Sequence, residues 1–341
     1  MRITAVLHRP VTDPAGAEQM LKEMLAYLDR RGHVVTVIVP RADGDPPASP
    51  VPHIYSRDVV GAAKGADVLL THLDATKAAM AAARRLDLPI VPVMHSNRRA
   101  EKIRMRKSRT VTGLVLNSQW LQEDWATIRP ELPRHVVYPP VDPADYTVAQ
   151  RDSLVTQINL SKNGALLWEV ARLLPGTRFL AVRGGYGRQV IPKVVPSNVE
   201  VIDTTDDPVG EIYARTRILL VPSLYESWGR VAMEAASSSI PVIASTMPGL
   251  QESLGGAGLF CDPERPADWA EAITVLSDPD VYAMYAERAC LRTEEVWAET
   301  QVQLEGLERF IVGVASRWVR SARTARGRGT APAPSGRLHP R

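Results

Sequence analysis

Two glutamates eight positions apart are the side chains that most plainly could bind a ligand. Glu226 and Glu234 lie in the segment 218–244, ILLVPSLYESWGRVAMEAASSSIPVIA. The segment predicts a buried strand, a loop with Glu226, a helix from about Gly229 that contains Glu234, and another buried strand. The unpaired amides at a helix start attract a pyrophosphate, and carboxylates bind paired hydroxyls such as those of a sugar or a ribose. The pattern therefore favours a ligand with both phosphate and sugar groups.

The same two glutamates could also be the acid and the base of a glycoside hydrolase. Eight helical residues span about 12 Å, whereas the two carboxyl groups of a hydrolase lie roughly 5–9.5 Å apart. The spacing therefore disfavours hydrolysis, and it favours two separate contacts along an extended ligand.

The segment ESWGRVAME, residues 226–234, resembles the signature of the retaining GT-B glycosyltransferases of family 4. Three further stretches, 16–39, 67–95 and 245–263, are similar to other parts of that family and occur in the same order. The resemblance thus covers nearly the whole body of the chain. It implies transfer of a sugar from a UDP- or GDP-linked donor to an acceptor hydroxyl with retention, without a metal or another cofactor.

The resemblance also implies roles for the residues of this segment. Glu226 should contact the hydroxyls of the donor sugar, and Glu234 should hold the ribose of the nucleotide. Backbone amides at the helix start should lie near the diphosphate, and the residues expected to supply them are Trp228, Gly229 and Arg230. The plain alternative is a solvated loop glutamate followed by a glutamate on a helix face.

A cation is expected beside the diphosphate. Lys162 ends the loop after the first strand of the second half, and a lysine there can offset the charge that grows on a leaving diphosphate. The family usually carries an arginine a few residues earlier, where this chain has Gln157 or Asn159. Arg183, at the end of the next strand, could supply the second charge, and Gly184 would let the backbone approach a phosphate.

Four more residues match positions of the family. His95 ends an apolar strand where the family has a histidine that faces the reacting centre, and an imidazole can hydrogen-bond a sugar hydroxyl there. Gly16 is what remains of the family's Gly-Gly pair in the loop that should close over the diphosphate. Gly249 and Glu252 match its glycine–glutamate element near the donor sugar. His72 resembles a position that is more often structural, and it receives no role.

No motif identifies the acceptor. The run 98–109, RRAEKIRMRKSR, holds seven cations and one acid and follows His95, on the side where the family binds its acceptor. It favours an anionic acceptor or an anionic surface, although a solvated charged face explains it as simply. Only Ile103 and Met105 are strongly apolar, so peripheral contact with a membrane fits better than an inserted helix.

Other classes of protein are disfavoured. The sequence has no cysteine pair at ligand spacing, no His-x-x-x-His, no P-loop and no G-x-G-x-x-G after its first strand. Metal, ATP and NAD(P) chemistry are therefore not expected. Two rivals stay open, a nucleotide-sugar epimerase of similar fold and a non-catalytic protein that binds sugar nucleotides. Conversion of the donor without an acceptor would indicate the first, and binding without product the second.

These residues need a scaffold that brings loops from both halves together. Apolar strands alternate with helical segments, which is typical of parallel sheets covered on both faces, and such sheets bind ligands beyond the carboxyl ends of their strands. The predicted strands are 3–7, 34–39, 67–71, 90–94 and 111–117, then 154–158, 179–182, 199–202, 218–221 and 241–244. We therefore expect an α/β chain of the GT-B kind, with two doubly wound (Rossmann-like) sheets facing across a cleft.

Composition suggests the domain boundaries. The expected parts are an acceptor-side domain 1–142, a linker 143–152, a nucleotide-sugar domain 153–300, a C-terminal helix 301–320 and a disordered Arg/Pro/Gly-rich tail 321–341. Seven arginines follow residue 316, so the formal net charge of +3 belongs to the end of the chain and not to a nucleic-acid-binding body. Nucleic acid is therefore not expected as a partner.

The general profile is that of a soluble globular protein, with 45% hydrophobic and 23% charged residues in 341. The two cysteines, Cys261 and Cys290, are expected to be reduced thiols. No apolar run approaches the ~20 residues of a spanning helix, and the N-terminus lacks the pattern of a signal peptide. We therefore expect a cytoplasmic protein.

Overall fold

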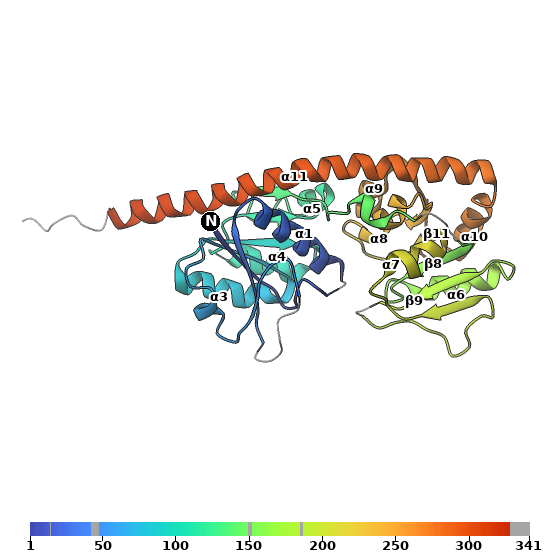
Figure 1. Ribbon diagram of the computed structural model, residues 1–341, viewed down its shortest axis with the longest axis horizontal. Helices are drawn as coiled ribbons and strands as arrows, with labels where there is room; N and C mark the ends of the chain where they lie inside the picture. The colour runs from blue at the N-terminus through green and yellow to red at the C-terminus, as the bar shows by residue number, and fades with distance from the viewer. Residues whose placement is uncertain (14, 42–47, 109, 149–151, 185–186, 328–341) are drawn as a thin grey trace, which may run out of the picture.

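The computed structural model of the protein describes residues 1–13, 15–41, 48–108, 110–148, 152–184 and 187–327. Two parallel sheets, one in each half of the chain, form two lobes that lie side by side (Figure 1). The last helix, α11 (Pro279–Gly327), runs along both lobes and returns the chain from the second to the first. The predicted class, two doubly wound α/β domains, is confirmed.

The described residues of the first lobe form seven strands and five helices. Its strands are β1 (Arg2–Val6), β2 (Val34–Val39), β3 (His53–Tyr55), β4 (Val68–His72), β5 (Ile90–Met94), β6 (Leu114–Leu116) and β7 (Arg134–Val136). Its helices are α1 (Gly16–Arg30), α2 (Val59–Ala62), α3 (Thr76–Leu86), α4 (Arg99–Lys107) and α5 (Gln119–Asp124), with a 3₁₀ turn η1 (Leu73–Ala75). The strand order is β3-β2-β1-β4-β5-β6-β7, so the chain winds outward from β1 in both directions.

The second lobe repeats this plan with six strands in the order β10-β9-β8-β11-β12-β13. These strands are β8 (Leu154–Ile158), β9 (Phe179–Val182), β10 (Val199–Ile202), β11 (Thr216–Val221), β12 (Val242–Ser245) and β13 (Gly258–Cys261). The helices are α6 (Gly164–Leu173), α7 (Pro208–Glu211), α8 (Arg230–Ser237), α9 (Pro248–Leu254) and α10 (Pro266–Val275). Three 3₁₀ turns complete it, η2 (Pro143–Tyr146), η3 (Tyr213–Arg215) and η4 (Gly255–Ala257).

Burial explains which segments form strands. Every residue of β4 and β5 is buried, because helices cover both faces of the sheet, and such strands appear in the sequence as continuous apolar runs. The helices show one apolar stripe instead, as in Met20, Met24 and Leu28 of α1, which all lie in the core. The short strands β3 and β7 contain His53 and Arg134, and for this reason neither was predicted.

Helix α11 belongs to both lobes. Its first turns pack on the core of the second lobe through Val281 and Tyr285. Its later turns pack in the core of the first lobe through Leu307, Ile311 and Val314, three or four residues apart. The two sheets therefore share one structural element, and its apolar stripe continues across the junction between them.

This continuity changes the expected ends of the second domain. Composition placed a boundary at residue 300 and a separate helix at 301–320, but the structure has one helix of 49 residues from Pro279 to Gly327. The expected tail therefore begins with helical backbone, and residues 328–341 lie outside the described part of the chain. Among the residues that the structure describes, no helix combines the length and the apolar character needed to cross a bilayer.

A glycine lets α11 lie against β7. His135 Nε2 lies 2.7 Å from the carbonyl oxygen of Gln303, and the side chain of Gln303 accepts the backbone N–H of Tyr138 at 2.7 Å. A Cβ at Gly306 would lie 2.5 Å from Cε1 of the His135 ring, which is closer than side chains approach. The close contact between helix and strand therefore requires glycine at this position.

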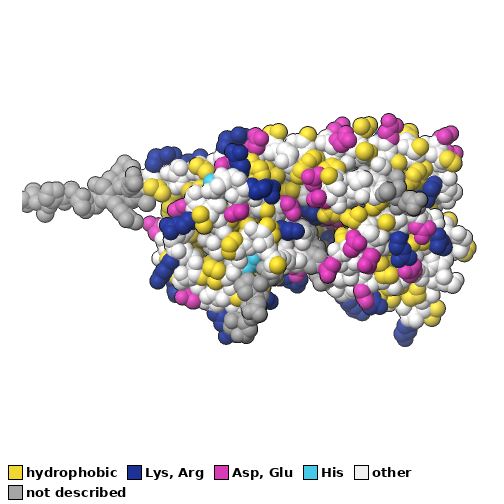
Figure 2. Space-filling view, viewed as in Figure 1, with side chains coloured by type: hydrophobic (Ala, Val, Ile, Leu, Met, Phe, Trp, Pro, Cys, Tyr) yellow, Lys and Arg dark blue, Asp and Glu magenta, His cyan; other side chains and the backbone are white. Residues whose placement is uncertain are grey.

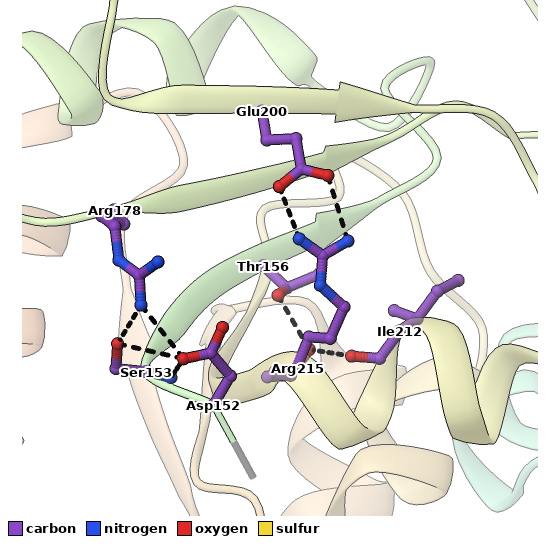
Figure 3. A network of polar contacts seen from close by, with 8 residues as sticks. Asp152, Ser153, Thr156, Arg178, Glu200, Ile212 and Arg215 are labelled. Carbon is purple, nitrogen blue, oxygen red and sulfur yellow. Dashed lines mark hydrogen bonds and ion pairs between the residues drawn. The ribbon is translucent and has the colours of Figure 1, made fainter.

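Polar contacts join the amino ends of four strands of the second lobe, β8, β9, β10 and β11 (Figure 3). Arg178, just before β9, donates to Asp152 at 3.0 Å and to Ser153 at 2.7 Å, which both precede β8. Arg215 donates to Glu200 of β10 at 3.1 Å. These contacts lie at the end of the sheet opposite the carboxyl ends of its strands, so they stabilise the scaffold without entering the loops that follow the strands.

Candidate functional site

Two adjoining cavities lie between the lobes, beyond the carboxyl ends of the strands. The first has a volume of about 400 Å³ and is lined mainly by the second lobe, and the second has about 630 Å³ and is lined mainly by the first lobe. Both are lined by Gly16, Lys162, Glu226 and Arg230. Figure 2 shows the surface hollowed between the two lobes. The residues predicted from three separate loops thus meet where the cavities adjoin.

Lys162 and Glu226 form the centre of this shared wall. Lys162 follows β8, and Glu226 lies in the loop between β11 and α8. The Nζ of Lys162 lies 3.4 Å from Oε2 of Glu226 and 3.5 Å from the carbonyl oxygen of Tyr225. The structure therefore brings the predicted cation and the predicted sugar-binding carboxylate together, beside both cavities.

Two glycines shape the loop that carries Glu226. Gly229 has a φ of +93° and forms the N-cap of α8, a conformation that favours glycine. A Cβ at Gly249, the second residue of α9, would lie only 2.3 Å from the carbonyl carbon of Ser227. Gly249 lines neither cavity, so in place of the predicted donor contact it lets α9 press directly on the loop.

Glu234 lies in α8 within a buried polar cluster on the wall of the first cavity. Its Oε1 accepts from Arg230 Nε at 2.7 Å, and its Oε2 accepts from the hydroxyl of Tyr213 at 2.6 Å. Arg230 also donates to the carbonyl oxygen of Pro140 at 2.6 Å and to the hydroxyl of Tyr146 at 3.0 Å. A carboxylate offers about four acceptor positions, so Glu234 keeps capacity for a ligand hydroxyl while its orientation is held.

The tyrosines of this cluster remain protonated at neutral pH. Burial, and then the nearby charge of Glu234, raise the pKa of Tyr146 to about 12. The same two causes raise the pKa of Tyr213 well above its usual value. Arg230 was predicted only for its backbone amide, but its side chain has the larger structural role because it fixes Glu234.

Trp228 differs from the prediction in a similar way. Its backbone lies at the wall of the second cavity, but its side chain is 1% exposed and stacks on Tyr138 with ring centroids 3.9 Å apart. Because Tyr138 follows β7, the stack joins the loop before α8 to the end of the first lobe. Trp228 therefore positions the helix start at which its amide was expected to bind phosphate.

Arg183 and Gly184 both line the first cavity, but their contacts differ from the prediction. Arg183 donates to Asp203 at 3.2 Å, so the proposed second cation already has an acidic partner. The amide of Gly184 donates to Oε1 of Gln189 at 2.9 Å, and a Cβ at Gly184 would lie 2.3 Å from the side chain of Asn159. The absence of a side chain at Gly184 thus makes room for Asn159, and its contact with a phosphate stays a prediction.

Glu252 lies outside both cavities, contrary to the prediction. Its carboxylate accepts the backbone N–H groups of Gln119 and Trp120, both at 2.7 Å. These residues form the first turn of α5 in the other lobe, where a negative charge is favourable beside unpaired amides. Glu252 therefore joins the two lobes, and a sequence cannot show that its acceptor is a helix start more than a hundred residues away.

Other contacts between the lobes hold the same loop. The backbone N–H of Asn97 donates to the hydroxyl oxygen of Tyr225 at 2.9 Å. Ser227 donates to the backbone carbonyl of His95 at 2.9 Å and accepts from Asn117 Nδ2 at 2.8 Å. The residues on either side of Glu226 are thus tied to the ends of β5 and β6, which fixes its carboxylate between the cavities.

His95 and Gly16 come from the first lobe. Gly16 begins α1 and lines both cavities, and His95 follows β5 and lines the second. Burial lowers the pKa of His95 to about 4, so its imidazole is neutral at neutral pH and can hydrogen-bond a hydroxyl. Its Nε2 is buried and has no hydrogen-bond partner among the described residues, as expected of a group that contacts a ligand.

Three side chains that the sequence did not bring together lie near His95. His8 follows β1, Glu18 lies in the first turn of α1, and His72 ends β4. Glu18 Oε1 lies 3.5 Å from His8 Nε2 and 3.7 Å from His72 Nε2. Burial raises the pKa of Glu18 to about 7 and lowers those of His8 and His72. The order of the strands is the feature that places these side chains together, because β1 and β4 are neighbours in the sheet and their carboxyl ends meet.

The basic run forms α4 beside the second cavity. Arg98 lines that cavity, whereas Lys102 pairs with Asp124 at 2.6 Å and is thus partly neutralised. Met105 is buried and Ile103 is 41% exposed, so the two apolar residues do not form a common exposed face. Arg109, the last cation of the run, lies outside the described residues.

Two family descriptions match the chain in succession. Residues 14–145 match Glycosyltransferase Family 4, and residues 162–278 match Glycosyl transferases group 1. The first match spans most of the first lobe. The second contains Lys162, Glu226 and Glu234, so both walls of the paired cavities lie within matched segments.

Curated relatives agree over parts of their length. D-inositol 3-phosphate glycosyltransferase of Corynebacterium glutamicum is 39% identical over 100 residues, which are 28% of this chain and 24% of that protein. The enzyme of the same name from Mycolicibacterium smegmatis is 26% identical over 193 residues, 48% of this chain and 44% of its own length. The matched region thus spans less than half of either relative.

Solved structures agree over nearly the whole chain. HepE of Anabaena, crystallised in complex with UDP-glucose, has a TM-score of 0.73 at 20% identity, over 91% of this chain and 100% of that one. Sucrose-phosphate synthase from Thermosynechococcus elongatus has a TM-score of 0.71 at 17% identity, over 92% and 100%. The chain therefore has the fold of the GT-B glycosyltransferases, and it contains a Glycosyltransferase Family 4 domain followed by a Glycosyl transferases group 1 domain.

Proposed function

We propose that the protein transfers a sugar from a UDP- or GDP-linked donor to an acceptor hydroxyl, with retention of the anomeric configuration. One observation carries this proposal. Lys162 and Glu226 come from loops after different strands, lie 3.4 Å apart and form the wall that both cavities share. A donor that bridges the cavities would place its diphosphate beside the cation and its sugar beside the carboxylate.

The first cavity suits the nucleotide. Glu234 lies on its wall, held by Arg230 and Tyr213 at 2.7 and 2.6 Å, and would accept the ribose hydroxyls. The start of α8 would receive the diphosphate through its unpaired amides. A fold relative, HepE, was crystallised with UDP-glucose, which supports a sugar nucleotide as the ligand of this fold.

The chemistry follows from these positions. The bond between the sugar C1 and the diphosphate oxygen breaks, and a bond from C1 to the acceptor oxygen forms on the same face. The proton of the acceptor hydroxyl leaves with the diphosphate. Lys162 and the α8 amides stabilise the charge on the leaving diphosphate, so the donor half of the reaction needs no metal. Glu226 holds the sugar hydroxyls, and no side chain is assigned as a nucleophile.

The second cavity suits the acceptor. It is lined by His95, which is neutral, and by Arg9 and Arg98, which are cationic. Arg9 pairs with Asp13 at 3.0 Å, so the guanidinium group of Arg98 is the one that favours an acceptor with a negative group. The curated relatives are named for a phosphate-bearing sugar alcohol, which is consistent with an anionic acceptor here.

The test is transfer by wild-type protein and by Glu226→Ala. Thermal shift with UDP-, GDP- and ADP-linked sugars selects the donor, and mass spectrometry then detects the glycosylated acceptor. Glu226→Ala should stay folded, bind the nucleotide and lose at least ~10²-fold in rate, whereas Glu264→Ala, an exposed control, should match the wild type. Wild-type turnover by Glu226→Ala would remove the assignment. If the protein epimerises the donor when no acceptor is present, it is an epimerase. If it binds the donor and forms no product, it is a non-catalytic protein that binds sugar nucleotides.

A further inference from the structure

We propose that His8, Glu18 and His72 bind a divalent transition-metal ion such as Zn²⁺ at the wall of the second cavity. The three side chains come from β1, α1 and β4, elements that meet at the carboxyl end of the first sheet. Their ligand atoms all lie within 4.8 Å of one another. His8 and Glu18 line the second cavity, which Lys162 and Glu226 also line, but the cluster contains neither of these two residues.

The distances suit one shared ion. Oε1 of Glu18 lies 3.5 Å from Nε2 of His8 and 3.7 Å from Nε2 of His72. Ligand atoms around a tetrahedral zinc ion, with bonds of 2.0–2.2 Å, lie roughly 3.4 Å apart. The same distances are too long for good hydrogen bonds. The side chains are therefore spaced as ligands of a common ion rather than as partners of each other.

Burial makes the cluster costly without a ligand. The side chains of Glu18 and His72 are 3% and 0% exposed. Among the described residues, neither ring nitrogen of His72 nor Oε1 of Glu18 has a hydrogen-bond partner. Buried polar groups are almost always satisfied, and a buried carboxylate needs a compensating charge. One cation would bind Nε2 of His72 and Oε1 of Glu18 and supply that charge.

The donor set indicates the class of metal. Two imidazoles and one carboxylate are the ligands of catalytic zinc sites with an open fourth position, and the same set also suits other first-row ions. Mg²⁺ and Ca²⁺ prefer oxygen ligands and would be poorly held here. Metal ions bind the neutral form of the imidazole.

The open position would face the acceptor. His8 and Glu18 line the second cavity together with His95, and the rings of His72 and His95 lie 5.4 Å apart. An acceptor oxygen, from a hydroxyl or a phosphate, could therefore complete the coordination and be oriented toward His95. This last step rests on the proposed function, whereas metal binding itself does not.

The experiment is calorimetric titration of Zn²⁺ into the full chain after removal of metals with a chelator. We expect one tightly bound ion per chain that excess Mg²⁺ does not displace. Glu18→Gln keeps the shape of the side chain and should weaken binding by at least ~10²-fold. His33→Gln is the matched control, because His33 pairs with Glu308 at 3.3 Å outside the cluster, and it should bind like the wild type.

X-ray absorption of the wild-type zinc complex keeps the proposal testable if Glu18→Gln fails to fold. The expected first shell holds nitrogen and oxygen at about 2.0–2.2 Å, including two imidazoles, and no sulfur. The site would be overturned if Glu18→Gln binds zinc as tightly as the wild type, or if the shell contains sulfur from Cys261 or Cys290. It would also be overturned if the wild type binds no zinc, and the three side chains would then share protons instead. If the protein transfers sugar but does not bind zinc, only the metal site is overturned. If it binds zinc but transfers no sugar, only the proposed function is overturned.

Discussion

Lys162 is surrounded by oxygen atoms on the side that faces the cavities. Its ammonium lies 3.4 Å from Glu226 and 3.5 Å from the carbonyl of Tyr225. In the proposed reaction, the negative charge of the leaving diphosphate grows beside this ammonium. Its interaction should therefore strengthen between bound donor and transition state, which is the condition for raising the rate rather than the affinity.

We accordingly predict that Lys162→Ala lowers kcat by ~10²–10³-fold and changes the donor KM much less. Steady-state kinetics with the donor selected by thermal shift would measure both constants. Lys64→Ala, at an exposed lysine of the first lobe, should leave them unchanged. An unchanged kcat with a weakened donor KM would mean that Lys162 only binds the ground state.

A second prediction concerns the support of Glu234. Tyr213→Phe removes the hydroxyl that donates to Glu234 at 2.6 Å and keeps the buried ring. We expect the donor KM to rise about tenfold, the cost of one hydrogen bond to a charged group, with little change in kcat. Tyr282→Phe, which removes a hydroxyl that donates to Arg217, is the control. Equal effects of the two substitutions would contradict a role in donor binding.

Site residues could be predicted from the sequence where the neighbouring residues along the chain indicate their role. They could not be predicted where their partners lie far away in the sequence. Glu226 and Lys162 follow strands of one lobe, so their loops could be placed from the strand pattern alone. Glu252 has an equally local pattern, but its carboxylate binds amides of the other lobe. The cluster around Glu18 depends on the order of strands in the sheet, which local spacing does not contain.

At the scale of elements, substitutions of glycines in α11 test how tightly this helix packs against the first lobe. Gly306 faces the His135 ring, where a Cβ would approach to 2.5 Å, whereas a Cβ at Gly313 would have no neighbour within 3.8 Å. Alanine normally stabilises a helix interior by about 0.5–1 kcal/mol over glycine. We therefore predict that Gly313→Ala raises the free energy of unfolding by this amount.

For Gly306→Ala we predict the opposite sign. The methyl group must displace either α11 or the His135 ring, which costs about 1–3 kcal/mol and exceeds the gain in helix propensity. Urea denaturation of the two variants would measure both changes. Stabilisation by Gly306→Ala equal to that of Gly313→Ala would show that the helix does not press on β7.

Most elements could be predicted because they are long or fully buried. The strands β4 and β5 appear as apolar runs, and α1 appears as a periodic stripe. The strands β3 and β7 have three residues each, too few to show a period. The C-terminal helix, expected from residue 301, begins at Pro279 in the structure. A helix that changes lobes keeps one apolar stripe, so the sequence contains no break at the junction.

For the whole molecule, the shared contacts predict joint unfolding. Trp228 of the second lobe stacks on Tyr138 at 3.9 Å, Glu252 caps α5, and α11 packs in the cores of both lobes. We expect a single cooperative transition in differential scanning calorimetry, with equal calorimetric and van't Hoff enthalpies. Two resolved transitions would show that the lobes are stabilised independently.

The site also belongs to the whole molecule, because each lobe supplies one side of it. The most direct measurement is a crystal structure of the Glu226→Gln variant with the UDP- or GDP-linked hexose that gives the larger thermal shift. We predict the ribose on Glu234, the diphosphate beside Lys162 and the first amides of α8, and the hexose next to residue 226 facing His95. A donor bound outside the two adjoining cavities would contradict the proposed function.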